Sequence, residues 1–332
     1  MTQRYTVAVA QVAPAFLDLA ASLRRAEEAI AEAARSGARL VAFAETWLPG
    51  YPSWADVGIP WEGAAAKAAF ARLHRGAVEV PGPATEALCR AARSHRVHVV
   101  IGMTERDARF SRGTLYNSLL FVSDTGEILG VHRKLVPTHS ERVIWGPGDG
   151  STLHVFDTPL GRLGGLICWE HWMPLARFAM HAKGEQVHVA AWPDLPEIHH
   201  VASRAYAFEG RCYVLCAGMY LPLDAVPRDL EVREALERVA AENPDPSLVL
   251  WGGSGVLGPD GEWVVGPVAG REEILLAEVD LDRIAAEQQA LDTAGHYHRP
   301  DVFSVTVDET PRVPVTWLRG DAEHTLRARP HP

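Results

Sequence analysis

Short β-branched runs alternate with alanine-rich stretches along most of the chain, and this alternation restricts the possible folds most strongly. Residues 5–12 predict a strand, residues 19–37 a helix, and residues 39–45 a second strand. Together they form a β-α-β unit, which usually builds a right-handed crossover. A helix near 84–94 and a strand at 97–103 continue the same pattern.

From residue 115 onward, paired strands are mixed with further β-α units. Residues 115–134 and 151–169 each predict two strands around a turn, and a helix is expected to begin near Pro174. The later elements expected are strands at 187–192, 212–218 and 273–281, helices at 198–209 and 229–242, and a hairpin at 251–268. Two sheets sandwiched between helix layers would accommodate this α/β pattern.

No change of composition marks a linker, so the sequence predicts one domain over residues 1–294 and a C-terminal tail over 295–332. Residues 46–75 contain several turn residues and three tryptophans, which predicts an inserted loop with a short helix.

The composition of the 332 residues argues against several functional classes. With a formal net charge of -10 and no basic stripe to bind a phosphate backbone, no nucleic-acid partner is expected. No apolar run approaches the roughly 18 residues of a membrane span, and the N-terminus lacks the segments of a signal peptide. Four scattered cysteines are too few for a disulfide scaffold, which favours a reducing cytoplasm.

Three polar residues stand at the ends of predicted strands: Glu45, Lys134 and Cys168. Each has an ordinary interpretation, because strands often end in a charged residue and free cysteine often packs as a small apolar side chain. Together they indicate more, since the carboxyl ends of strands form the edge where open α/β sheets bind ligands. A thiol can attack a substrate, a carboxylate can move protons, and an ammonium can offset developing negative charge.

The surroundings of Cys168 favour a nucleophile. Pro174 stands where a helix should begin, and a thiol that faces a helix N-terminus is expected to have a lowered pKa. The alternative is a histidine base, as in papain-like enzymes. The chain has 15 histidines, but His171 is too near Cys168 in sequence to be placed as that base.

Three sequence blocks around these residues resemble the nitrilase superfamily of carbon–nitrogen hydrolases. The blocks are FAETWLPGYP, HRKLVPTHSERVIWGPGDG and GGLICWEHWMPLARF, and they look most like the true nitrilase branch. The resemblance implies that Glu45 is the general base, Lys134 the electrostatic stabiliser and Cys168 the nucleophile. Glu141 would then be the second, structural or proton-positioning glutamate.

The resemblance also implies an α-β-β-α sandwich and the hydrolysis of a nitrile, by two waters, to a carboxylic acid and ammonia. The intermediates would be a thioimidate and a thioester on the cysteine, and neither a metal nor an organic cofactor would be needed. The backbone N–H of Trp169 would stabilise developing charge. Tyr51, Trp54, Trp169 and Trp192 would line an apolar substrate pocket, although core packing explains a tryptophan equally well.

Three alternatives stay open at this stage. An amidase or a cyanide-converting hydrolase would share the same cysteine chemistry, and a catalytically inactive binding member would share the fold. Family members commonly form dimers or larger spiral assemblies, so the resemblance predicts a homo-oligomer in which the tail of residues 295–332 contacts another subunit.

Overall fold

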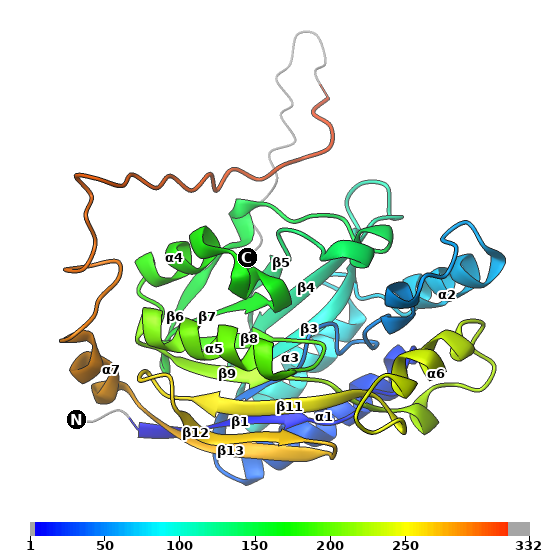
Figure 1. Cartoon of the computed structure of the whole chain (residues 1–332), viewed down its shortest axis with the longest axis horizontal. Coiled ribbons are helices and arrows are strands. Elements are labelled where there is room, and N and C mark those ends of the chain that lie inside the picture. Colours follow the sequence, from blue (N-terminus) through cyan, green and yellow to red (C-terminus); the bar gives the residue numbers. More distant parts are fainter. Residues whose placement is uncertain (1–3, 318–332) are drawn as a thin grey trace.

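Two mixed sheets lie between layers of helices in the computed structural model of the chain, which describes residues 4–317 (Figure 1). The first sheet has the strand order β13-β1-β2-β3-β4-β5. In it β1, β2 and β3 run parallel, and the remaining pairs are antiparallel. Its strands are β1 (Arg4–Gln11), β2 (Ala38–Ala42), β3 (His98–Arg106), β4 (Leu115–Val122), β5 (Ile128–Arg133) and β13 (Glu273–Asp280).

The second sheet has the order β10-β11-β9-β8-β7-β6, with β12 paired to β11. Its central strands β7, β8 and β9 run parallel, as do β1, β2 and β3 in the first sheet. Its strands are β6 (Val155–Thr158), β7 (Gly161–Ile167), β8 (Val187–Ala191), β9 (Tyr213–Ala217), β10 (Tyr220–Pro222), β11 (Leu248–Leu257) and β12 (Trp263–Ala269).

Helices cover the outer faces of both sheets. The helices α1 (Leu19–Arg35) and α3 (Pro83–His95) pack on the first sheet, and α4 (Pro174–Ala182) and α5 (Glu197–Gly210) pack on the second. Local sequence explains where they begin: Asp18 accepts a hydrogen bond from the N–H of Ala21, and α3 and α4 each start with proline. The arrangement confirms the predicted α-β-β-α sandwich.

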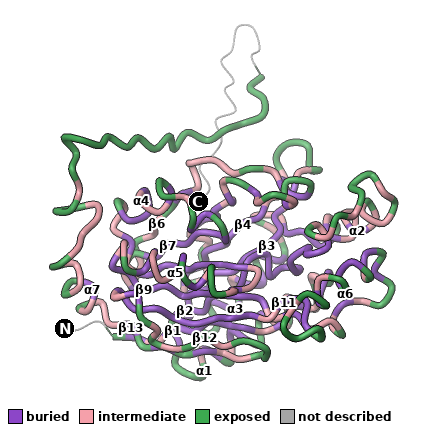
Figure 2. Tube along the Cα trace, viewed as in Figure 1, coloured by how far each residue is buried: buried purple, intermediate pink, exposed green. Residues whose placement is uncertain are grey.

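The facing sides of the sheets form one apolar core. Figure 2 shows the strands buried at the centre and the last described segment exposed at the surface. Long aliphatic and aromatic side chains fill the space between the sheets, among them Val7, Leu119, Phe121, Leu163, Val189 and Leu215. Strands buried on both sides read as continuous apolar runs, which explains why β-branched runs dominate the parallel parts of both sheets.

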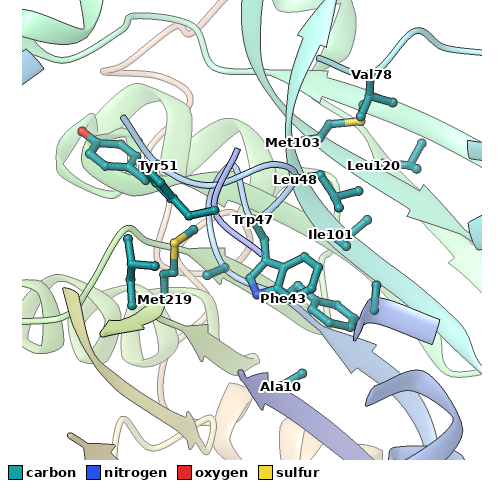
Figure 3. Close-up of a cluster of buried hydrophobic side chains, with 14 of the residues drawn as sticks. Ala10, Phe43, Trp47, Leu48, Tyr51, Val78, Ile101, Met103, Leu120 and Met219 are labelled. Atoms are coloured by element: carbon teal, nitrogen blue, oxygen red, sulfur yellow. The ribbon is translucent and has the colours of Figure 1, made fainter. Parts of the chain in front are cut away.

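A second cluster fixes the chain on either side of Glu45. Phe43 and Trp47 pack edge to face with ring centroids 5.1 Å apart, close to Ile101 of β3 (Figure 3). The indole N–H of Trp47 also donates to the carbonyl of Val12 at 2.7 Å. The carboxylate between these anchored residues therefore has little freedom.

The structure confirms most expected elements and differs at their ends. The strand expected over 39–45 ends at Ala42, because the chain leaves the sheet towards Thr46, which has a left-handed φ of 42°. The strand expected over 273–281 ends at Asp280, whose side chain accepts from the N–H of Asp282 and so begins α7 (Leu281–Gln288). The inserted loop contains a 3₁₀ helix, η1 (Ser53–Val57), and α2 (Ala64–Arg75), and the acidic stretch forms α6 (Arg233–Ala241).

Beyond α7 the described chain continues to residue 317 without a helix or strand. Its contacts with the body include the hydrogen bond from the Thr293 hydroxyl to the Glu209 carbonyl at 3.0 Å, the Lys183–Glu309 ion pair at 2.5 Å and the hydrogen bond from the N–H of Arg312 to Asp149 at 2.7 Å. The rest of the predicted tail, residues 318–332, lies outside the described residues. No helix in residues 4–317 has both the length and the apolar character needed to cross a membrane.

Candidate active site

The fold brings all three predicted residues, Glu45, Lys134 and Cys168, together with Glu141 in one small buried cluster. One oxygen of Glu45, one oxygen of Glu141 and the sulfur of Cys168 all lie within 4.8 Å of one another. Glu45 comes three residues after β2, whereas Cys168 directly follows β7 of the other sheet. The cluster therefore lies where the ends of the two sheets meet, and its side chains are nearly inaccessible to solvent.

Lys134, the first residue after β5, joins the two carboxylates. Its Nζ donates to Glu45 Oε1 at 2.9 Å and to both oxygens of Glu141, at 3.0 and 2.7 Å. Burial alone would lower the pKa of this ammonium, but the neighbouring Cys168, Glu45 and Glu141 raise it above the usual value. Lys134 is therefore a fixed positive charge inside the cluster.

Four hydrogen bonds hold the carboxylate of Glu141 in place. It lies in the 3₁₀ helix η2 (His139–Val143), and it accepts the hydroxyl of Tyr51 at 2.9 Å and the N–H of Thr138 at 2.7 Å. Because both oxygens also bind Lys134, every strong acceptor position of this carboxylate is in use. Glu141 can orient the ammonium, but it has no free oxygen with which to take up a proton.

Glu45 differs in having one free oxygen. Its Oε1 accepts from Lys134 and from the amide of Asn117 at 2.5 Å, whereas Oε2 is buried and has no hydrogen-bond partner among residues 4–317. Burial raises the pKa of Glu45 to about 7 against the opposing charge of Lys134. A carboxylate with a free oxygen and a pKa near neutrality is suited to general base catalysis.

Cys168 has a strained backbone and a neutral thiol. Its φ is 52°, a left-handed value that is costly for a residue with a Cβ, and residues in such conformations often occur at functional sites. The expected lowering of its pKa is wrong: burial, followed by the charge of Glu45, raises the pKa well above the usual value. Cys168 does not lead directly into α4: it begins the 3₁₀ helix η4 (Cys168–Trp172), and α4 starts only at Pro174.

Two further residues of the site were not predicted from the sequence. Asn117 lies within β4, whose sequence carries no distinctive motif, and the pairing of β3 with β4 brings it beside Glu45. Glu170 accepts from the N–H of Leu135 at 2.8 Å and from that of Ile167 at 2.7 Å. It therefore ties together the two segments that follow Lys134 and precede Cys168. Its place two residues after the cysteine was the only available signal.

The predicted pocket aromatics have different environments. Tyr51 contacts the cluster through Glu141, as described above. Trp54 is buried against Phe16, with ring centroids 6.1 Å apart, and Trp192 is fully buried and stacks on His199 at 4.3 Å. The side chain of Trp169 is about half exposed (52%) and donates to His199 at 3.2 Å.

The acidic and thiol groups of the cluster are also suited, by residue type, to hold a cation. The Lys134 ammonium, however, lies within hydrogen-bond distance of both carboxylates. The position that a bound metal would share with these oxygens is thus next to a fixed positive charge, which would repel it.

Gly102 of β3 makes room for the segment that carries Glu45. A Cβ at this position would lie 2.2 Å from the carbonyl oxygen of Ala44 and 2.5 Å from the nitrogen of Thr46. We expect Gly102→Ala to displace Glu45 and to lower kcat by about 10²-fold, since misplacing a reacting group by about 1 Å has effects of that size. Gly113→Ala is the matched control, because only the Ser111 hydroxyl lies within 4 Å, at 3.8 Å. Equal kcat values for the two variants would contradict the prediction.

Comparison with known proteins places this fold and cluster in a defined class. The family described as carbon–nitrogen hydrolase matches residues 6–289. The chain is 43% identical over 319 residues to Nitrilase 2 from an unknown prokaryotic organism, covering 96% of this chain and 97% of the relative. It is 41% identical to a bifunctional nitrilase/nitrile hydratase of Lupinus angustifolius (93% and 87% covered) and 37% identical to an aliphatic nitrilase of Rhodococcus rhodochrous (98% and 89%).

Solved structures share the fold at lower identity. Nit3 of Saccharomyces cerevisiae, a member of branch 10 of the nitrilase superfamily, has a TM-score of 0.65 at 21% identity, with 90% of this chain and 97% of that chain covered. An amidase from Nesterenkonia sp. has a TM-score of 0.60 at 20% identity, with 86% and 95% covered. The molecule is thus an α-β-β-α enzyme of the nitrilase superfamily. The chain belongs to the carbon–nitrogen hydrolase family.

Proposed function

We propose that this protein is a nitrilase, which hydrolyses a nitrile to the carboxylic acid and ammonia. The observation that carries the proposal is the buried cluster in which a thiol, a carboxylate with a free oxygen and a fixed ammonium lie together. Relatives named as nitrilases, at 37–43% identity over almost the whole chain, support it.

In the first half of the reaction, the thiol of Cys168 gives its proton to the free oxygen of Glu45 and the sulfur adds to the nitrile carbon. The C≡N bond becomes C=N, and the nitrogen takes up the proton, which gives a thioimidate. The Lys134 ammonium and the N–H of Trp169 stabilise the charge that develops on this nitrogen. A thiol that is neutral at rest fits this order, because Glu45 removes the proton only when the substrate is present.

In the second half, Glu45 takes a proton from a water molecule, which adds to the same carbon. Ammonia leaves, with the proton returned through Glu45, and a thioester remains on Cys168. A second water then hydrolyses the thioester, releasing the acid and restoring the thiol. Glu141 keeps the Lys134 ammonium in place throughout. The substrate and water are the only reactants, so no organic cofactor enters the scheme.

Incubation of the purified protein with aliphatic, aromatic and arylacetonitrile substrates tests the proposal. Ammonia and acid should appear in equal amounts, and Cys168→Ala should release neither. Amide as the main product would favour partial hydration, and turnover of amides or of cyanide alone would favour the amidase or cyanide-converting alternatives. No turnover in any of these assays would overturn the proposal.

An inactive binding member is tested separately. If the cluster is reactive, iodoacetamide should label Cys168 rapidly and at one equivalent, and Glu45→Gln should abolish the rapid phase because it removes the base. Slow labelling of Cys168 in both proteins would support the inactive alternative.

The thiols of all four cysteines are free, which agrees with our further proposal of a cytoplasmic location.

We also propose that residues 295–332 contact another copy of the chain. Large apolar side chains in the described part of this tail are exposed, among them Tyr297, Phe303 and Trp317 at 62–70%. Removing residues 295–332 should lower the molecular mass measured by light scattering to that of a smaller assembly. A full-length protein that is monomeric, or a truncated one with unchanged stoichiometry, would contradict this prediction.

A further inference from the structure

A row of buried polar side chains leads away from the backbone of Cys168. The carbonyl of Cys168 contacts His171 Nδ1 at 2.7 Å, and His171 Nε2 contacts His188 Nε2 at 2.9 Å. His188 Nδ1 contacts Glu185 Oε1 at 2.8 Å, and the hydroxyl of Tyr206 donates to Glu185 Oε2 at 2.5 Å. All five residues are buried, and the reaction described above uses only the first.

The directions of these hydrogen bonds follow from counting donors. A carbonyl only accepts, so His171 must carry its proton on Nδ1, and a neutral His171 then accepts at Nε2. His188 must therefore carry a proton on Nε2 and accept at Nδ1. The last partner, Glu185, must then be a protonated acid that donates to His188. The row is complete only when Glu185, or His188 in its place, holds one extra proton.

Removal of that proton would reverse the donor and acceptor roles along the row. A Glu185 carboxylate would accept from His188 Nδ1, which leaves His188 Nε2 without a proton. His171 would then have to donate from Nε2, and its bare Nδ1 would face the Cys168 carbonyl at 2.7 Å. Two acceptors at that distance repel each other, so the contact with Cys168 would be lost.

The contact matters because of the peptide unit to which the carbonyl belongs. The C=O of Cys168 and the N–H of Trp169 share one rigid plane and point in opposite directions, so fixing the first aims the second. The Trp169 N–H interacts with the Cys168 side chain, where it favours the thiolate. A hydrogen bond on the carbonyl also polarises the N–H of the same unit.

We propose that Glu185, His188 and His171 are positioning residues for Cys168: through one donated hydrogen bond on its carbonyl, they hold the left-handed nucleophile and aim the Trp169 N–H. The inference deepens the proposed nitrilase function and rests on it for the role of this N–H in stabilising the substrate nitrogen.

The surroundings of Glu185 favour the protonated acid. Burial raises its pKa to about 8, and burial lowers the pKa of both His188 and His171 well below the usual value. The other titratable groups around Glu185 are Tyr206, His181 of α4 and Cys212. They are neutral, because burial lowers the pKa of His181 to about 4 and raises those of Tyr206 and Cys212.

The charged groups that influence the neighbours of Glu185 are themselves paired with other groups. The positive charge of Arg177 lowers the pKa values of His181 and Tyr206, but Arg177 forms its own ion pair with Glu209 at 2.8 Å. Glu170 and His132, which act on His188, are paired with each other at 2.9 Å. The acid therefore loses its proton near pH 8 without a cation to compensate for the charge, and the positioning bond should weaken above that pH.

The test compares Glu185→Gln with Glu185→Leu. Glutamine donates to His188 from its amide and accepts from Tyr206, and it does not titrate. At neutral pH, Glu185→Gln should therefore keep kcat close to the unmodified enzyme. Glu185→Leu cannot donate, and its kcat should fall by about 10-fold or more with little change in KM. Equal kcat values for the leucine variant and the unmodified enzyme would overturn the proposal.

A pH series tests the proposal without the leucine variant, which could lose activity simply by failing to fold. The ratio of the Glu185→Gln rate to the unmodified rate should be close to one at pH 6 and rise several-fold by pH 9, because only the unmodified row loses its proton. A ratio that stays constant over this range would overturn the proposal, even if the leucine variant fails to fold.

The same ratio can be measured without any nitrile. Iodoacetamide labelling of the peptide that contains Cys168, in a Cys89→Ser background that removes the one partly exposed thiol, reports on the nucleophile alone. If no nitrile is hydrolysed but the labelling ratio rises with pH, the positioning row stands and the nitrilase assignment falls. If the protein hydrolyses nitriles but the labelling ratio does not change with pH, the nitrilase assignment stands and the positioning proposal falls.

Discussion

Glu45→Gln should reduce nitrile hydrolysis by about 10²–10⁴-fold, the range that a well-placed general base contributes. Glutamine is nearly isosteric, and its carbonyl can still accept from Lys134 and Asn117 as Oε1 does now. What it lacks is the basic oxygen that now stands free at Oε2. The loss should therefore appear in kcat rather than in the melting temperature.

The raised pKa of Glu45 also predicts how the activity changes with pH. Glu45 acts as a base only when it is deprotonated, and its pKa is raised to about 7. The acidic limb of kcat/KM should thus rise as pH increases through about 7, and the residual activity of Glu45→Gln should lack this limb. Glu278→Gln, on the exposed side of β13, is the matched control. A normal acidic limb in Glu45→Gln would show that another group is the base.

Lys134→Met should abolish activity and also destabilise the fold by roughly 3–5 kcal/mol, the usual effect of removing one partner of a buried ion pair. The side chain of Lys134 is fully buried, and its ammonium is the cation that both Glu45 and Glu141 bind. Without it, two buried carboxylates would face each other. Urea denaturation and the nitrile assay measure the two effects separately.

A double variant separates stability from catalysis. In Lys134→Met with Glu141→Gln, only the Glu45 carboxylate remains in the cluster, so part of the lost unfolding free energy should return while the activity does not. Lys67→Met is the surface control: Lys67 pairs with Glu62 in solvent, where a pair contributes about 0–1 kcal/mol. If the double variant were no more stable than Lys134→Met, repulsion between the carboxylates would not explain the loss.

Much of the fold could be predicted because its signals are local. The apolar run that became β8 is buried at every position, and the helical spacing of apolar residues in α1 places Ala26, Ile30 and Ala33 on one buried side. Proline at the start of α4 was likewise a sufficient signal. Element ends were harder to predict: β2 stops at Ala42, where the chain leaves the sheet towards Thr46 and its left-handed φ.

Single residues of the site could be predicted only where the sequence around them was distinctive. Cys168 and Lys134 lie in blocks that resemble a known superfamily, so their positions were expected. Nothing distinguishes Asn117 or Glu185 in the sequence, because each has its partner in another segment. Asn117 binds Glu45, which is 72 residues away, and Glu185 binds Tyr206, which is 21 residues away. Such partners are set by strand pairing and helix packing.

The order of strands and helices and the family were thus determined by the sequence itself, through local periodicity and short motifs. The tertiary structure alone decided the charge states in the cluster. Burial raises the pKa of the Cys168 thiol, where a helix N-terminus was expected to lower it, and leaves Glu45 able to titrate near neutrality. The physical reason is that a pKa depends on lost hydration and on charges within a few ångströms, and only the packed chain specifies either.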